Sequence, residues 1–367
     1  MKTAKIKAWV TSIVFVACIF GFGIGFLLLP DNDVSISERR NLKQPPKLSI
    51  TTIIDGSAFD EYEVYIQDQF PMRNTFRTFK AISEYYCFIK ADNNDIYICD
   101  GFVCKQDYPL DCDAVLDASE KCNELYYELF DGRTAYYSII PDKNFFVAKK
   151  SGHLSYDYDE LYAIMEGNMD KSIQYINISD MLSINQYYNT DIHWKQECIV
   201  SVSDEILVRM GETPPERDYE RHSMTPFYGA YFGQAALPFP ADELIYLTND
   251  ILNHCVVYNP IKDEITPLYD LSEFGGIDSY SIFASGSESL LIITNPYNNS
   301  NKELYIVRDS FASSLVPLLI ENYTRIILID PRYISCDVLT KYVTPNENAT
   351  VLYIFSTTIL NKGYLFR

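Results

Sequence analysis

An acid, a histidine and a tryptophan lie within four positions of one another in the stretch DIHW, residues 191–194, although the chain has only four histidines and two tryptophans. An imidazole can act as a general base near neutral pH, and a neighbouring carboxylate can fix its tautomer. In an extended D-x-H segment both side chains point to the same side of the backbone. We therefore expect Asp191 to hold one ring nitrogen of His193, leaving the other for a nucleophile, with Trp194 covering the ring.

A serine that such a base could activate follows an apolar run much later in the chain. Asp309 and Ser310 come directly after the strand expected from Glu303 to Val307, and ligands gather at the carboxyl ends of strands in open α/β sheets. A serine hydroxyl is a weak nucleophile unless a base takes its proton. A helix that begins beyond it would direct free N–H groups and its positive end toward an oxyanion. The pattern predicts a catalytic triad of Ser310, His193 and Asp191.

Two other functional classes fit the same residues. The first is a non-catalytic binding or assembly protein of the cell envelope that keeps the fold, because fold alone does not convey function. The second is a metal-dependent hydrolase with Asp191, His193 and Asp309 as ligands. One histidine and two acids make a thin ligand set for a transition metal, and the sequence contains no CxxC pair. We therefore expect no metal and no cofactor.

The elements that must position these residues alternate between helix and strand. Residues 303–329 read as a βαβ unit, with a helix from about Ser313 and a second strand from Arg325 to Ile329; we interpret Ser313 and Ser314 as N-terminal capping residues. Upstream, helical patterns cover 121–130, 158–169 and 195–211, and strand patterns cover 134–140, 173–178 and 289–294. This order predicts an α/β fold with a mostly parallel sheet and helices on its faces.

The segment before the alternating region has a different pattern. Residues 58–90 place aromatic and aliphatic side chains at three- and four-residue spacings, which predicts an amphipathic helix broken near Pro71. Two short β-like pieces follow, and the intervening Asp100-Gly101 is typical of a hairpin turn.

The N-terminus reads as a membrane anchor. Residues 8–29 contain no charge and as a helix would cross roughly 30 Å of hydrocarbon, and the lysines before them predict a cytoplasmic N-terminus and an exported remainder. A cleaved signal peptide is the rival interpretation, but the apolar run is long and LLLPDND lacks a small-x-small cleavage site. We expect a cytoplasmic tail at 1–7, a single transmembrane anchor at 8–29, an extracellular tether at 30–57 and one catalytic domain at 58–367.

The net charge limits the kinds of binding partner that we expect, and the cysteine content bears on possible disulfides. The chain carries a net charge of −20, and such a surface repels nucleic acid and anionic lipid, so we expect neither as a partner. Of nine cysteines, eight lie outside the apolar segment. Export would permit disulfides, and Cys99 with Cys104 or Cys112 with Cys122 are conceivable pairs.

The exported part of the chain contains a series of short motifs. In chain order they are SERRNL and QPPKL after the anchor, then YIQDQFPMR, IIPDKNFF, YYNTDIHW, FYGAYFG, DSYSIF, VRDSFASSLVPLL and IDPRY. In these motifs the chain resembles the DHHW protein family of Gram-positive bacteria and, through it, the alginate O-acetyltransferases. The family often has histidine where Ile192 stands here.

The resemblance implies an SGNH-hydrolase-like three-layer α/β/α domain with Ser310 as nucleophile, His193 as base and Asp191 as its orienting acid. It also implies a membrane-anchored acetyltransferase or acetylesterase for a cell-surface glycan, to which a multi-pass O-acyltransferase supplies acyl groups. Arg332 and Trp194 are the candidate substrate contacts, and an ion pair between Arg332 and Asp330 is the alternative role for Arg332.

Overall fold

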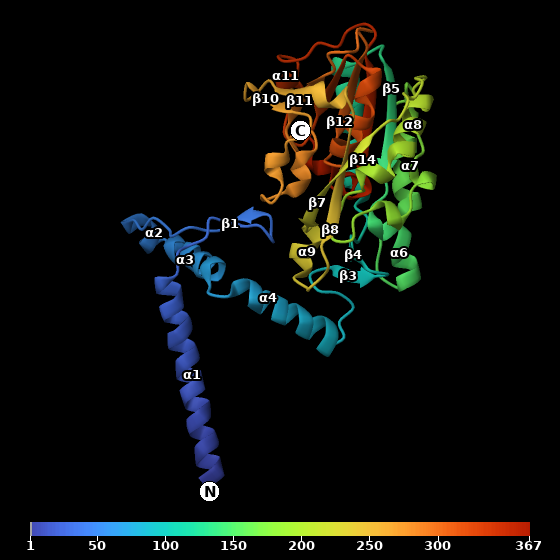
Figure 1. Cartoon of the computed structure of the whole chain (residues 1–367). Helices are drawn as coiled ribbons and strands as arrows, with labels where there is room; N and C mark the ends of the chain where they lie inside the picture. Colours follow the sequence, from blue (N-terminus) through green and yellow to red (C-terminus); the bar gives the residue numbers. More distant parts are fainter. Residues whose placement is uncertain (1) are drawn as a thin grey trace. The chain divides into compact units, whose positions relative to one another are not determined.

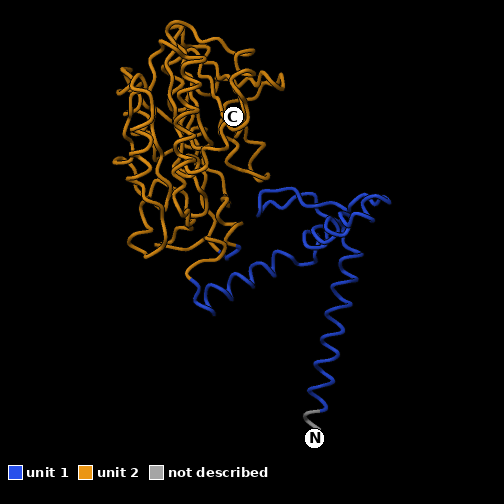
Figure 2. The backbone as a smooth tube through the Cα atoms, turned by 180° about the vertical axis from the view of Figure 1, so that it is seen from behind, with its two compact units in different colours: residues 1–90, 236–238 blue, residues 91–235, 239–367 orange. Residues whose placement is uncertain are grey.

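The computed structural model describes residues 2–367, so Met1 of the predicted cytoplasmic tail lies outside it. The chain divides into two compact units, residues 1–90 with 236–238 and residues 91–235 with 239–367 (Figure 2). Unit 2 therefore begins after residue 90, whereas the sequence prediction starts the catalytic domain at residue 58. Unit 1 contains α1 Lys2–Leu28, β1 Val34–Ser35, β2 Arg40–Asn41, α2 Ile50–Ile54, α3 Ser57–Gln69, α4 Arg73–Ile82 and a π-helical turn Ser83–Cys87.

Helix α1 contains the predicted apolar segment 8–29 except its last residue, Leu29. Among the described residues, Lys5–Leu28 is the one stretch of helix long and apolar enough to cross a membrane, and a signal sequence would share these properties. The segment after it is not an extended tether throughout, because β1 and β2 form a short hairpin. Arg40 on this hairpin pairs with the buried carboxylate of Asp68 on α3 at 2.5 Å, and this hydrogen-bonded pair lowers the pKa of Asp68.

Helices α3 and α4 meet at Pro71, where the sequence predicts a break. Proline cannot donate a backbone hydrogen bond and restricts the residue before it to extended conformations. Phe70 accordingly has ψ of 129°, and Met72 lies in the left-handed region with φ of 59°. The predicted hairpin is also present, since β3 Ile96–Cys99 and β4 Phe102–Lys105 pair antiparallel around Asp100 and Gly101, which both have positive φ.

Unit 2 is built on an eight-stranded sheet of order β10-β9-β11-β13-β12-β14-β5-β6 (Figure 1). Five neighbouring strands, β13 to β6 in that order, are parallel, and β11, β9 and β10 extend the sheet antiparallel. Their bounds are β5 Thr134–Ile140, β6 Ile173–Tyr175, β9 Val256–Asn259, β10 Glu264–Pro267, β11 Leu290–Thr294, β12 Glu303–Arg308, β13 Arg325–Ile329 and β14 Thr350–Ser356; a separate pair joins β7 Glu220–Phe227 to β8 Asp242–Thr248.

Both faces of the parallel strands are buried. In β12, Leu304 and Ile306 pack on the face covered by α8, while Tyr305 and Val307 pack on the face covered by α5 and α7. The predicted α/β class, with a mostly parallel sheet between two helical layers, is confirmed. The helices of unit 2 are α5 Cys112–Leu129, α6 Lys143–Ser151, α7 Tyr158–Asn168, α8 Val200–Arg209, α9 Ala230–Ala235, α10 Ala312–Leu315, α11 Cys336–Leu339 and α12 Thr357–Leu360.

Strand order explains how distant segments meet. β5 comes early in the chain but lies beside β14, the last strand, and β6 lies on the other side of β5. The DIHW segment follows β6, and Ser310 follows β12, two strands away from β5 in the sheet. Because the carboxyl ends of parallel strands share one edge, both segments can reach the same place.

The helix expected from about Ser313 is much shorter than predicted. Helix α10 ends at Leu315, and short 3₁₀ turns at Val316–Leu318 and Ile320–Asn322 follow. Pro317 lacks the N–H that an α-helix would need at that position, so the segment cannot continue as a regular helix. The strand predicted over 173–178 is also shorter, ending at Tyr175.

The contact between Gly363 and α5 generates a stability prediction. A Cβ at residue 363 would lie 1.9 Å from the Ala114 carbonyl oxygen and 2.7 Å from the Ala118 Cβ. We expect Gly363→Ala to destabilise unit 2 by about 1–3 kcal/mol through overpacking. The matched control is Gly167→Ala on α7, where nothing lies within 4 Å of the added carbon. Guanidinium unfolding of both variants in a Trp9→Phe background, followed by fluorescence of the buried Trp194, would measure both, and equal midpoints for the two variants would contradict the prediction.

Candidate active site

A chain of two hydrogen bonds joins the three predicted triad residues. The Ser310 Oγ lies 2.8 Å from the His193 Nε2, and the His193 Nδ1 lies 2.5 Å from the Asp191 Oδ1. Asp191 and His193 are buried, whereas Ser310 is partly exposed. The arrangement gives a reachable hydroxyl, a base beside it and a carboxylate behind the base.

The turn that carries Ser310 is held by the residue before it. The buried Asp309 carboxylate accepts from the Phe311 backbone N–H at 3.0 Å and from the Ser356 N–H at 2.7 Å. Since Ser356 ends β14, this carboxylate ties the nucleophile turn to the neighbouring strand. It is thereby engaged in two structural hydrogen bonds, which argues against its predicted alternative role as a metal ligand.

The expectation that a helix points its free amides at Ser310 is wrong. Helix α10 has only four residues. The Phe311 N–H is taken by Asp309, and the N–H groups of Ala312 and Ser313 bond to carbonyls of the same turn. Within the part of the chain that the structure describes, the Ser310 N–H is engaged in no hydrogen bond. It is the amide that remains available beside the hydroxyl.

The DIHW segment is a bent loop and not the extended strand that the D-x-H pattern suggested. Asp191 Oδ1 accepts from the backbone N–H of His193 at 3.0 Å as well as from its ring, and Oδ2 accepts from the Ala230 N–H at 2.7 Å. The carboxylate is therefore fixed on both sides. The approach of Ala230 requires Gly229, because a Cβ there would lie 2.2 Å from the Asp191 Cβ.

A buried lysine donates hydrogen bonds to the backbone just before the DIHW segment. The Lys143 Nζ, at the start of α6, donates to the carbonyls of Tyr188 at 3.0 Å and Asn189 at 3.1 Å. Burial lowers the pKa of Lys143 to about 8. A buried ammonium needs such acceptors, so the lysine and the loop backbone hold each other in place.

The imidazole is covered by Tyr280 and not by Trp194. The Tyr280 ring stacks on His193 with centroids 3.8 Å apart and planes 3° apart, and its hydroxyl donates to the Ser314 Oγ at 2.7 Å. Trp194 is fully buried, and its Nε1 donates to the Phe311 carbonyl and to Ser314 Oγ, both at 3.0 Å. Trp194 thus has no surface to offer a substrate, which corrects the prediction that it contacts one.

The serines after the nucleophile do not cap the short helix. Ser314 accepts from Trp194 and Tyr280, and the Ser313 Oγ accepts from the buried Arg308 Nη1 at 3.2 Å. Arg332, the other predicted substrate contact, forms a two-pronged ion pair with Asp330, at 2.8 Å from Nε and 2.6 Å from Nη2. Its side chain is only 14% exposed, so the ion pair that the sequence left as the alternative is the one present.

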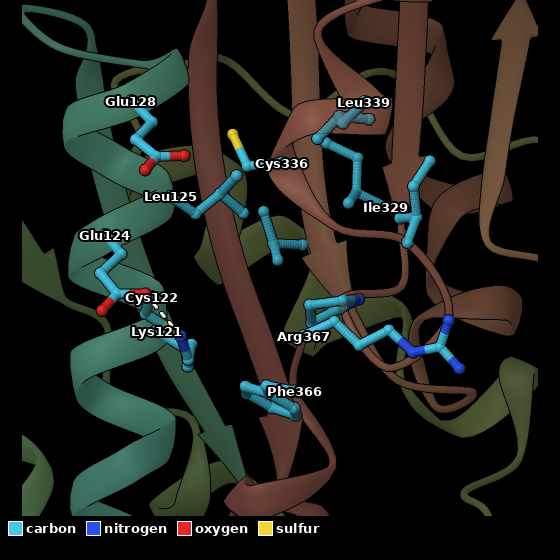
Figure 3. A pocket seen from close by; sticks show the side chains of 13 residues that line it. Lys121, Cys122, Glu124, Leu125, Glu128, Ile329, Cys336, Leu339, Phe366 and Arg367 are labelled. Carbon is cyan, nitrogen blue, oxygen red and sulfur yellow. Dashed lines mark hydrogen bonds and ion pairs between the residues drawn. The ribbon is translucent and has the colours of Figure 1, made fainter.

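The remaining candidates lie away from the triad. Among residues 2–367, no three His, Cys, Asp or Glu side chains gather in a way that could hold a metal ion. All nine cysteines, which lie in this range, are free, so neither conceivable disulfide is formed. A pocket between α5, the β12–β13 pair and the C-terminal residues contains none of the triad, and Cys122, Cys336 and Arg367 are among its lining side chains (Figure 3).

Sequence reasoning missed three supporting residues: Lys143, Gly229 and Tyr280. Each acts on the triad through a segment far away in the chain, so no local spacing indicated its role. The one available signal was that each lies inside a motif of the family resemblance: IIPDKNFF, FYGAYFG and DSYSIF.

Solved structures share this fold. A DHHW family protein from Eubacterium siraeum aligns with a TM-score of 0.60 at 15% identity, over 75% of this chain and 94% of that chain. Bacillus cereus PatB1 aligns with a TM-score of 0.60 at 18% identity, over 74% and 98%. The O-acetyltransferase domain of Pseudomonas putida AlgJ aligns more weakly, with a TM-score of 0.42 at 9% identity over 72% and 92%. No curated protein sequence matches significantly. The predicted SGNH-hydrolase-like fold is confirmed.

A protein-family model matches the part of the sequence that contains the three hydrogen-bonded residues Asp191, His193 and Ser310. Residues 148–329 match the family model described as DHHW protein. This range contains Asp191, His193 and Ser310, and also the departure at Ile192. Over this range, which includes both halves of the site, the chain is similar to the DHHW protein family.

Proposed function

We propose that the protein is a serine-dependent O-acyltransferase or esterase, acting on O-acetyl groups of a cell-surface glycan. The observation that carries the proposal is the continuous hydrogen-bonded chain from the Ser310 hydroxyl through His193 to the buried Asp191 carboxylate. In this chain the base can take the serine proton, and the acid can stabilise the imidazolium that results.

The reaction has two steps of the same kind. Ser310 Oγ attacks the acyl carbonyl while His193 Nε2 takes its proton, and the proton passes to the departing oxygen as the acyl-enzyme forms. A sugar hydroxyl or water then gives its proton to His193 and attacks the acyl carbon, and the Ser310 oxygen leaves with the proton from His193. The free Ser310 N–H lies next to the reacting oxygen and supplies one donor to the oxyanion. Shielding of the acyl-enzyme from water decides between transfer and hydrolysis.

A solved structure suggests a chemical probe for the site. One structural neighbour at 17% identity is Bacillus cereus PatB1 with a sulfonyl adduct, which suggests sulfonyl reagents as probes for this chain. We further propose that α1 is an uncleaved anchor with a cytoplasmic N-terminus, that unit 2 is exported, and that a multi-pass O-acyltransferase supplies the acyl groups. The non-catalytic binding or assembly role is the rival that the next experiment separates.

Removal of the hydroxyl or of the base should abolish catalysis. We expect Ser310→Ala and His193→Ala to lower acetate release from p-nitrophenyl acetate and acetylated glycans at least about a thousandfold, as for other triads. A fluorophosphonate or sulfonyl fluoride probe should label the unaltered protein and Ser300→Ala, an exposed serine control, but not Ser310→Ala. If Ser310→Ala labels as strongly as the unaltered protein, or if no probe or substrate reacts at all, the binding role is favoured.

The tight contact at Gly229 should make the site sensitive to one methyl group. Because a Cβ there would collide with Asp191, we expect Gly229→Ala to displace the carboxylate and reduce kcat/KM about a hundredfold, as small misplacements of catalytic groups do. Gly167→Ala, with open space around it, should keep full activity. An unchanged Trp194 emission maximum would show that Gly229→Ala is folded. Full activity of a folded Gly229→Ala would contradict this role.

The buried Lys143 should make stability depend on pH in a defined direction. Its pKa is about 8 in the folded chain and about 10.4 in an unfolded chain. Between these values the unfolded chain binds more protons, so the free energy of unfolding rises with pH, by up to about 3 kcal/mol. We expect the unaltered protein to gain this stability relative to Lys143→Met between pH 8 and 10. Lys149→Met, at an exposed position, controls for the lost charge, and a difference that does not change with pH would refute the prediction.

A further inference from the structure

Helix α4 and the turn after it expose a row of large apolar side chains. Met72, Phe76, Phe79 and Tyr86 are 63%, 45%, 69% and 60% exposed. Their spacings of four, three and seven residues place them on one side of the helix. Single exposed apolar residues are ordinary, but a continuous row of this kind marks an interaction surface.

The other side of α4 already has partners. Arg73 and Arg77 pair with Glu38 at 2.5 and 3.3 Å, and so they hold the helix to the segment before it. The stretch from Arg73 to Ser83 contains three basic residues and no acidic one. Because Arg73 and Arg77 are paired with Glu38, the exposed Lys80 is the basic residue of this stretch that could meet a lipid head group.

The start of helix α4 packs against α1. The Phe22 ring lies 5.4 Å from the rings of Phe70 and Phe76, centroid to centroid. Pro71, between α3 and α4, approaches α1 so closely that a Cβ on Gly25 would lie 3.2 Å from its Cγ. The corner between α3 and α4 therefore packs against α1 itself.

The position of this contact along α1 sets its depth. Phe22 precedes Leu28, the last residue of α1, by a distance of about 9 Å along the helix axis. In a helix that crosses the bilayer, that level lies inside the outer hydrocarbon layer. The Phe70 and Phe76 rings that contact Phe22 then reach into this layer from the boundary between hydrocarbon and head groups.

We infer that α4 and the turn Ser83–Cys87 lie on the outer surface of the same bilayer that α1 crosses, with Met72, Phe76, Phe79 and Tyr86 inserted into it. The inference rests on the proposed anchor but not on the proposed catalysis. Phe88 and Ile89, 72% and 84% exposed, extend the surface, and aromatic side chains favour this region of the membrane. Anchoring then involves a transmembrane helix and an interfacial helix together.

The test uses the full chain reconstituted in phosphatidylcholine–phosphatidylglycerol vesicles, with or without bromine on the acyl chains as a quencher. Trp9→Phe alone leaves only the buried Trp194 and gives the baseline. Adding Phe79→Trp or, separately, Phe88→Trp should give additional emission that brominated lipid lowers at least about twofold, as expected for side chains inserted at the interface.

Each outcome is decisive. If the additional emission at both positions is quenched no more than the baseline, the interfacial helix is excluded, whether solvent or another protein covers this face. If Trp9 of the unaltered protein is not quenched, α1 does not lie in the bilayer and the inference falls with the anchor. Ser310→Ala should leave the quenching unchanged, so failure of this inference and failure of the proposed catalysis can be told apart.

Discussion

The site depends on a buried carboxylate whose two oxygens are both satisfied. Burying an ionised group is costly unless hydrogen bonds replace its water. Asp191 gains these bonds from the backbone and ring of His193 and from the Ala230 N–H. One carboxylate thus fixes the base, its own loop and the segment that begins α9. The requirement for glycine at residue 229 follows, because Ala230 can approach only where the preceding residue has no side chain.

A second buried carboxylate does the same for the nucleophile. Asp309 binds the Phe311 amide within its own turn and the Ser356 amide at the end of β14. The two halves of the site are therefore each set by an acid one or two residues before the reactive group. The parallel sheet brings the halves together, because its strand order differs from the chain order. The catalytic proposal thus rests on backbone hydrogen bonds of the sheet edge as much as on the three side chains.

The sequence predicted the parts of this arrangement that local pattern controls. Apolar runs indicated β5, β12 and β13, and the D-x-H spacing indicated the pairing of Asp191 with His193. It failed where a distant segment decides the outcome. The stacking of Tyr280 on the imidazole depends on a loop that no spacing relates to His193. The segment after Ser310 has a helical composition, but Pro317 and burial on all sides keep it to a single turn of helix.

Trp194 shows how a residue can be correctly singled out and yet misassigned. Its place beside the histidine suggested a wall against solvent, whereas its indole N–H bonds to the Phe311 carbonyl and to Ser314. It therefore joins the loop of the base to the segment just after the nucleophile. The Ser314 hydroxyl also accepts a hydrogen bond from Tyr280, whose ring stacks on the imidazole. Ser314 therefore links Tyr280 to the segment just after the nucleophile. These hydrogen bonds join the segments that carry His193 and Ser310, which gives a structural reason for a tryptophan next to the histidine.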